Sequence, residues 1–107
     1  MEHTFKIIRE EEQDGCWMFQ ITVLDENGLK MDHEHTLRLA WEDYDLWVRD
    51  GTIEPSVVAQ AILRHLESTP NPRPLPERID SSYPRRIDPD ADRQIVELID
   101  PVSFRSP

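Results

Sequence analysis

The sequence WMFQITVL, residues 17–24, decides the fold because apolar and polar side chains alternate along it. Every second position carries a large apolar residue: Trp17, Phe19, Ile21 and Val23. This is the spacing of a β-strand with one buried face. An Asp-Gly pair precedes the stretch and an Asn-Gly pair follows it, and both are typical of hairpin turns. The stretch therefore predicts the central strand of an antiparallel meander.

The flanking segments complete a three-stranded meander over residues 1–39. In the first strand, Phe5 and Ile7 alternate with polar residues. In the third strand, one face is expected to carry Leu29, Met31, His33, His35, Leu37 and Leu39. The other face of the sheet would carry Cys16, Met18 and Leu24.

The register follows from the requirement that all apolar residues share one face. Three-residue loops at 13–15 and 26–28 satisfy this requirement. They pair Ile7 with Ile21 and Phe19 with His35. A two-residue loop at the second turn would instead set the apolar face of the central strand against charged residues of the third.

After the meander, the apolar spacing becomes helical over residues 40–68. The first helix is predicted to bury Trp41, Tyr44 and Trp47/Val48, with Gly51 as its stop. Pro55 suits the first turn of a second helix. The apolar stripe of that helix comprises Val58, Ala61, Ile62, His65 and Leu66. Both helices would cover the apolar face of the sheet.

The last third begins with a proline-rich strap at 69–87. Prolines at 70, 72, 74 and 76 exclude helix and central strand there. Asp88 is the predicted N-cap of a C-terminal helix at 88–100, and 101–107 is a loose tail. That helix would bury Ala91, Ile95, Leu98 and Ile99. We expect it to reach the second face of the sheet, over Met18 or Leu24, or a second subunit.

The fold class is therefore α+β in one domain, 1–107: a three-stranded antiparallel meander with two helices on one face, then a proline-rich strap and a third helix. The net charge of −10 is concentrated in residues 1–54, which hold five Lys/Arg against fourteen Asp/Glu. This charge argues against nucleic-acid binding and favours a basic protein partner. Without an apolar run long enough for a membrane, a signal-like N-terminus or a second cysteine to pair with Cys16, we expect a cytoplasmic protein.

Two histidines on one strand, His33 and His35, are the candidate metal ligands. Alternate strand positions can place two imidazoles on one ion. A third ligand would have to come from the helices, for example His65. A structural role at the edge of the core is the preferred interpretation, so no metal and no cofactor are predicted.

The sequence contains no glycine-rich phosphate loop and no metalloprotease or serine-hydrolase motif. We therefore expect a protein that is not an enzyme. The candidate interaction residues are charged positions in the two halves of the chain: Asp43, Asp45, Asp50, Arg85 and Arg86. The three aspartates are interpreted as a solvated acidic face.

Two resemblances extend this reading. TLRLAWEDYDLWVRDGTIEPSVVAQAILRHLES resembles a ribbon-helix-helix unit, a family in which paired strands of a dimer enter the DNA major groove and many members are antitoxins. The resemblance implies DNA contacts by Thr36 and Arg38 and a phosphate contact near Ser56. HTLRLAWEDYDLW, EPSVVAQAILRHL and LPERIDSSYPRRIDPD resemble small bacterial proteins of unassigned function that carry an L-P-x-x-[IF]-D segment.

The leading hypothesis is a non-catalytic interaction or regulatory protein that uses its acidic half, with a homodimer left open. The alternative is a ribbon-helix-helix-like DNA-binding regulator or antitoxin. The edge of the third strand separates the two hypotheses. If residues 36–39 pair within the chain, they cannot form the ribbon between two copies.

Overall fold

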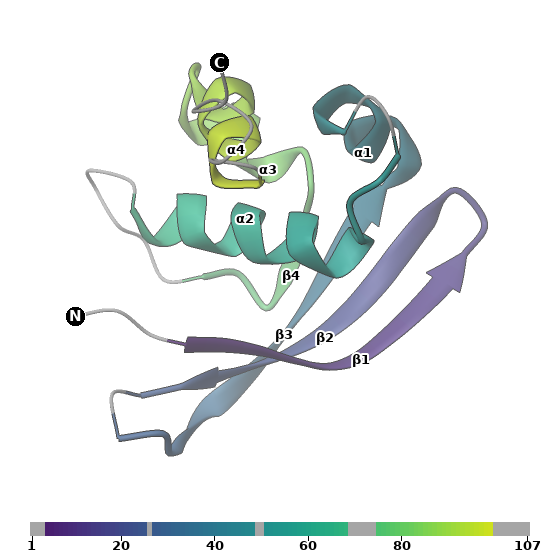
Figure 1. Cartoon of the computed structure of the whole chain (residues 1–107). Helices are drawn as coiled ribbons and strands as arrows, with labels where there is room; N and C mark the ends of the chain where they lie inside the picture. Colours follow the sequence, from purple (N-terminus) through teal and green to yellow (C-terminus); the bar gives the residue numbers. More distant parts are fainter. Residues whose placement is uncertain (1–3, 26, 49–50, 69–74, 100–107) are drawn as a thin grey trace.

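The protein folds into a four-stranded mixed sheet with helices packed over one face (Figure 1). A computed structural model describes residues 4–25, 27–48, 51–68 and 75–99, with the backbone alone for 31–33. The strands are β1 (Thr4–Gln13), β2 (Cys16–Leu24), β3 (Lys30–Ala40) and β4 (Arg78–Asp80). The helices are α1 (Trp41–Trp47), α2 (Pro55–Glu67), α3 (Tyr83–Ile87) and α4 (Ala91–Ile99). The predicted α+β class is confirmed.

β1, β2 and β3 form the predicted antiparallel meander, and β4 adds to β3 as a parallel strand. The Thr36 N–H donates to the Glu77 carbonyl, and the Ser81 N–H donates to the Arg38 carbonyl, both at 2.8 Å. The strap predicted at 69–87 therefore contains two short elements, β4 and α3, that the sequence analysis did not predict, whereas residues 69–74 lie outside the described residues. The strand begins just after the last proline of the run, where the chain regains its N–H donors.

The β1–β2 pair contains a bulge that the sequence analysis did not predict. Ile7 pairs with Ile21 as predicted, but the register then shifts and leaves Ile8 unpaired. The strands join through a two-residue turn, Asp14 and Gly15, with Gly15 at φ 82°, and not through a three-residue loop. A bulge plus a two-residue turn places Phe5 and Ile7 of β1 opposite the same residues of β2 as a three-residue loop would. The apolar faces therefore still coincide.

From Thr22 back to Cys16, the β2–β3 pair is displaced by two residues from the predicted register. Phe19 pairs with Leu37, and His35 pairs with Ile21. Leu24 pairs with Lys30, as the predicted three-residue loop requires, and the Asp25 N–H donates to the Leu29 carbonyl at 2.9 Å. The displacement arises from a shift of the register between Thr22 and Leu24. Side chains alternate with a period of two, so the displacement keeps the same face toward the core. Leu29 itself lies before β3 and is exposed, not part of the apolar face.

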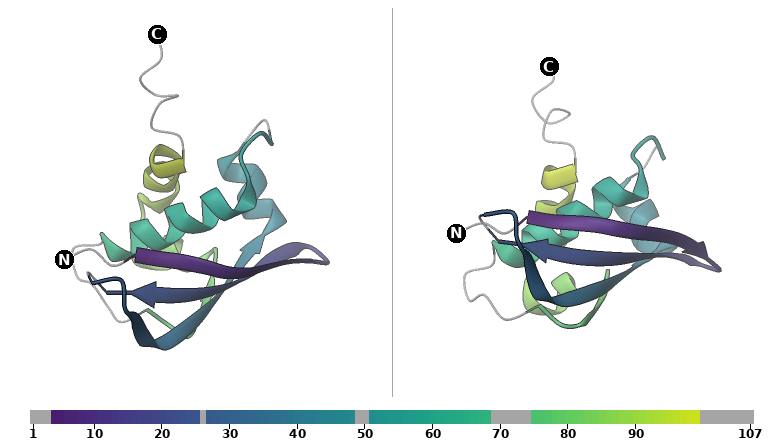
Figure 2. Two further views of the ribbon diagram at one scale, coloured as in Figure 1. Left: turned by 60° about the horizontal axis from the view of Figure 1, so that its bottom comes forward. Right: turned by 90° about the horizontal axis from the view of Figure 1, so that it is seen from below.

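α2 lies between the sheet and α4, and the core extends over both sides of it (Figure 2). In addition to the predicted stripe, Ala59 and Leu63 of this helix are buried. A helix that is apolar over so much of its surface needs a second partner. The core residues fully removed from solvent include Phe19, Ile21, Leu37, Leu39, Val58, Ile62, Leu63, Ile79 and Ile95.

α4 is that second partner, which contradicts the predicted position of the C-terminal helix. It packs on α2 and not on the second face of the sheet. Ala91, Ile95 and Ile99 are buried, whereas Leu98 is exposed. Full burial of Ile95 alone stabilises the fold by roughly 2 kcal/mol. The helix begins at Ala91, and Asp88 precedes it in a turn whose carboxylate accepts the Asp90 N–H at 2.9 Å.

α1 is short and covers the end of the sheet nearest the β1–β2 turn. Tyr44, Trp47 and Val48 are buried as predicted, but Trp41 is 40% exposed. The Trp41 N–H donates to the Gly15 carbonyl at 3.0 Å, so the helix starts directly where β3 leaves the sheet. The Trp41 ring contacts Trp17 with 6.2 Å between ring centroids.

Candidate functional site

Of the two candidate metal ligands, His33 and His35, only His35 has a described side chain. The side chain of His33 lies outside the described part of the chain. His35 Nδ1 lies 2.7 Å from the Pro76 carbonyl oxygen, so this nitrogen carries a proton and donates it. In residues 4–25, 27–48, 51–68 and 75–99, no three His, Cys, Asp or Glu side chains are grouped as a metal site would require. His35 keeps one nitrogen, Nε2, for a ligand.

The structure brings together two of the five predicted interaction residues. Arg85 Nη2 lies 3.1 Å from Asp43 Oδ1. Asp43 is buried, so its interpretation as part of a solvated acidic face is wrong. Asp45 and Arg86 are exposed, and Asp50 lies outside the described residues. Arg85 and Asp43 are 42 positions apart in sequence, which is why spacing could not pair them.

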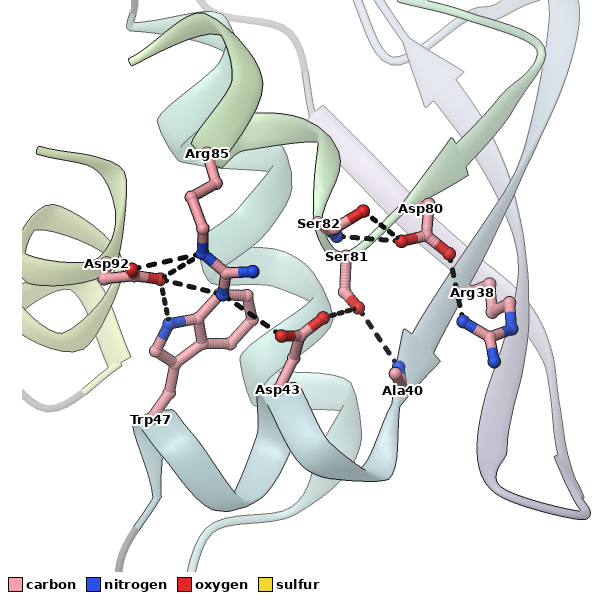
Figure 3. A network of polar contacts seen from close by, with 9 residues as sticks. All are labelled: Arg38, Ala40, Asp43, Trp47, Asp80, Ser81, Ser82, Arg85 and Asp92. Atoms are coloured by element: carbon pink, nitrogen blue, oxygen red, sulfur yellow. Dashed lines mark hydrogen bonds and ion pairs between the residues drawn. The ribbon is translucent and has the colours of Figure 1, made fainter. Parts of the chain in front are cut away.

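Arg85 of α3 connects α1 to α4 (Figure 3). Its Nε and Nη2 donate to the Asp92 carboxylate at 2.9–3.1 Å, and Nη2 also donates to Asp43. The guanidinium stands 5.8 Å from the ring centroid of Trp47, whose Nε1–H donates to Asp92 at 2.8 Å. Hydrogen bonds to Asp92 and then to Asp43 raise the pKa of Arg85. The Arg85 hydrogen bond likewise lowers the pKa of Asp92.

Ser81, between β4 and α3, completes the contacts of Asp43. Its hydroxyl donates to Asp43 Oδ2 at 2.5 Å and accepts the Ala40 N–H at 3.1 Å. The side chain is fully buried. The hydroxyl proton is thus directed at a carboxylate, and its oxygen has no access to a substrate. This serine fixes the end of β3 to α1 rather than acting as a nucleophile.

Asp80 of β4 holds the adjacent turn. It accepts hydrogen bonds from the Ser82 N–H and hydroxyl and from Arg38 Nη1, the last at 3.0 Å. Burial raises the pKa of Asp80, but the bonds from Ser82 and Arg38 outweigh that effect, so the pKa is lowered overall. Arg38, a DNA-contacting residue by the ribbon-helix-helix resemblance, is therefore engaged within the chain.

His65 of α2 and Asp88 form the remaining contact between the helices and the C-terminal segment. His65 is fully buried, with Nε2 2.8 Å from Asp88 Oδ2. The His65 contact lowers the pKa of Asp88. Within the described residues His65 Nδ1 has no hydrogen-bond partner.

These contacts bind the C-terminal segment to the rest of the fold. The carboxylates of Asp43, Asp80, Asp88 and Asp92 are each bonded to a side chain from another element or turn. Their charges are therefore satisfied internally, and a ligand would have to displace them. The role that this network supports is structural.

Elsewhere, β1 is an edge strand of the sheet formed by the described residues. β1 ends the strand order, and Figure 1 shows it at the front of the sheet. The direction of the backbone N–H and C=O groups alternates along β2. The Gly15 carbonyl accepts the Trp41 N–H, so the backbone groups of the odd-numbered residues of β2 point toward β3. The β1 residues opposite those odd positions therefore direct their own N–H and C=O groups outward. They are Phe5, Ile7, Glu10 and Glu12.

The side chains of this outward set share the face covered by α2. They pair with Val23, Ile21, Phe19 and Trp17, which belong to the core or pack against it. The bulge at Ile8 places these four side chains on one face, because odd-numbered residues of β1 point to that face before the bulge and even-numbered residues point to it afterwards. Without the bulge, Glu10 and Glu12 would point to the opposite face.

The first half of this edge borders an open groove of about 520 Å³ between β1 and α2. Its walls are predominantly apolar. The lining residues are Thr4, Phe5, Lys6, Ile7, Leu24, Ser56, Val57 and Gln60. Val57 is 41% exposed there. Gln60 Nε2 donates to the outward Phe5 carbonyl at 2.9 Å, so one backbone acceptor of the edge is occupied by a side chain.

The second half of the edge is acidic. Glu10 and Glu12 are exposed, and neither has an ion-pair partner among the described residues. Glu11, between them, faces the other side and lies 3.8 Å from Arg9. The edge thus combines an apolar groove with unpaired carboxylates on one face. Sequence analysis identified the acidic character of this half but not its position, because the bulge decides which face the acids occupy.

Both edges of β3 are occupied over residues 36–38, by β2 on one side and β4 on the other. A ribbon between two copies requires one free edge there. Over these residues, the described strands leave no such edge for a second copy. In the L-P-x-x-[IF]-D segment, Ile79 is buried and Asp80 caps the turn, so that segment has a structural role here.

Comparisons with family models, with curated proteins and with solved structures found no match. None of the described helices combines the length and the apolar character needed to cross a membrane.

Proposed function

We propose that this protein is a non-catalytic interaction module that binds a basic segment of a partner protein along β1. The observation that supports this most directly is the pair of unpaired carboxylates, Glu10 and Glu12, on an open strand edge. A strand edge offers backbone donors and acceptors to a second chain, and the carboxylates select one of opposite charge. The internally bonded Asp43 and Asp92 do not compete for the same ligand.

The surrounding charge favours the same class of partner. Residues 1–54 carry fourteen acidic against five basic side chains. Such an excess raises the local concentration of a cationic ligand and speeds its association at low ionic strength. It also opposes the approach of nucleic-acid phosphates and of a second copy of the chain.

The experiment is a titration of the full chain with an eight-residue peptide of alternating lysine and threonine, with a glutamate–threonine peptide as its control. Trp17 lies opposite Glu12, so tryptophan fluorescence reports binding at this end of β1. We expect the lysine peptide to bind and the glutamate peptide not to bind. Affinity for the lysine peptide should fall as added salt shortens the Debye length below about 10 Å, because the exposed charges are then screened.

The matched variants are Glu10→Gln/Glu12→Gln and Glu42→Gln/Asp45→Asn. Both remove two exposed negative charges, from β1 and from α1 respectively. The β1 variant should weaken binding about fivefold, as two exposed ion pairs would. The α1 variant should change it less than about twofold. If the two peptides bind equally, or if the two variants behave alike, the proposed function is wrong.

A further inference from the structure

We propose, building on the function above, that the partner's segment joins the sheet as a strand beside β1. An apolar half of that segment would lie in the groove against α2, and a basic half would lie opposite Glu10 and Glu12. Within the part of the chain that the structure describes, the strand order gives β1 a neighbouring strand on one side only. The ligand is thus an extended peptide with both apolar and basic residues at alternate positions.

The first step is the backbone geometry. Phe5, Ile7, Glu10 and Glu12 direct their N–H and C=O groups away from β2. An added strand would bond to these residues and not to the intervening ones, whose groups already bond to β2. The bulge residue, Ile8, divides the edge into an apolar half and an acidic half.

The second step is the groove. Val57 of α2, which is 41% exposed, lines it together with Phe5 and Ile7 of β1. Alternate side chains of an added strand point toward α2 on this face. Two apolar side chains of the partner would therefore occupy the groove, while the next two in register would reach the acidic half.

The third step concerns Gln60. Its side-chain amide donates to the Phe5 carbonyl at 2.9 Å, which is one of the acceptors an added strand would use. The amide therefore takes the place of the incoming backbone N–H and must be displaced when the strand binds. Removing the Gln60 amide should therefore strengthen the binding of the added strand.

The test uses the full chain and the peptide Lys-Thr-Lys-Thr-Val-Thr-Val-Thr, which matches β1 in the antiparallel direction. Amide hydrogen exchange, read residue by residue, should slow on binding at Phe5, Ile7, Glu10 and Glu12. It should change little at the neighbours already bonded to β2. A ligand held by side chains alone does not produce this alternation.

Three variants complete the test. Val57→Lys should weaken binding about tenfold, because it removes an apolar wall and adds a cation. Leu98→Lys makes the same change at a similarly exposed position, 39%, on α4 and should change affinity less than about twofold. Gln60→Ala should strengthen binding between about two- and tenfold, the range for the net contribution of one hydrogen bond.

If the peptide binds but the protection does not alternate, or if Val57→Lys and Leu98→Lys have equal effects, strand addition is overturned while the proposed function stands. If the lysine–threonine peptide also fails to bind, both are overturned. A Gln60→Ala variant that binds no more tightly than the wild type contradicts the displacement step and with it the docking of a strand at Phe5.

Discussion

Arg85 is the residue whose loss should reveal how the C-terminal segment is held. Replacing it by methionine keeps much of the side-chain volume but leaves the Asp43 carboxylate without its cation. The Asp43 side chain is only 10% exposed, whereas Arg85 and Asp92 are 37% and 44% exposed. Removing one partner of a fully buried pair costs roughly 3–5 kcal/mol, and an exposed pair contributes about 1 kcal/mol or less.

The intermediate exposure of this cluster places Arg85→Met between those limits. Asp43 keeps its hydrogen bond from Ser81, which reduces the cost further. We expect a loss of about 2 kcal/mol in the free energy of unfolding. With a urea dependence of about 1–3 kcal/mol per molar for a small protein, the unfolding midpoint should fall by about 1 M.

The assay is urea unfolding followed by tryptophan fluorescence. Arg93→Met is the control, because Arg93 is 63% exposed and pairs with Asp90 and Glu97 at 3.4–3.6 Å on the surface. It should cost less than about 0.5 kcal/mol. Adding Asp43→Asn to Arg85→Met should recover about 1 kcal/mol, since the unpaired charge is then gone. The reasoning is refuted if Arg85→Met and Arg93→Met unfold at the same urea concentration, or if Asp43→Asn recovers nothing.

Four further outcomes are expected. The pKa values of Asp80, Asp88 and Asp92 are lowered in the folded state, so these carboxylates stabilise the fold above the ordinary carboxyl pKa and lose this effect as pH falls through the folded-state values. The urea midpoint should therefore be flat from neutral pH to about 5 and should fall below about pH 4. A midpoint unchanged at pH 3 would contradict this. A chain ending after Ser68 lacks β4 and α4 and should show no cooperative unfolding transition by circular dichroism; a melting temperature within a degree or two of the full chain would contradict this. Duplex DNA should not bind at physiological salt, and a salt-sensitive gel shift at low micromolar protein would show otherwise. Zinc should bind weakly, because no three His, Cys, Asp or Glu side chains of the described residues are grouped as ligands; stoichiometric submicromolar binding abolished by His33→Ala would contradict this.

The sequence was sufficient for the elements whose signal is local. The alternation at Trp17, Phe19 and Ile21 identified β2, and Pro55 with its apolar stripe identified α2. The side chains that each meander strand directs toward the core were also predictable, because they depend only on the alternation of odd and even positions. The exact register was not, since a bulge at Ile8 and a register shift between Thr22 and Leu24 leave the same side chains on each face.

What the sequence could not provide depends on distant partners. Ile79 lies in a three-residue strand that exists because β3 offers an edge to it, and three residues carry no periodicity of their own. Asp43 looked like one more surface acid until Arg85 and Ser81 were placed beside it. The sequence analysis predicted a three-residue loop at 13–15 because it allowed for no bulge, although an Asp-Gly pair is typical of two-residue hairpin turns.

The parallel pairing of β4 with β3 also has a consequence for synthesis on the ribosome. β3 leaves the ribosome about forty residues before β4, so its outer edge and the α4-facing side of α2 stay uncovered during that interval. An uncovered strand edge beside an apolar helix invites pairing with other nascent chains. The acidic first half emerges earlier, and its mutual repulsion keeps neighbouring chains apart until the last strand arrives. The negative charge of residues 1–54 would then protect the polypeptide before it has any partner to bind.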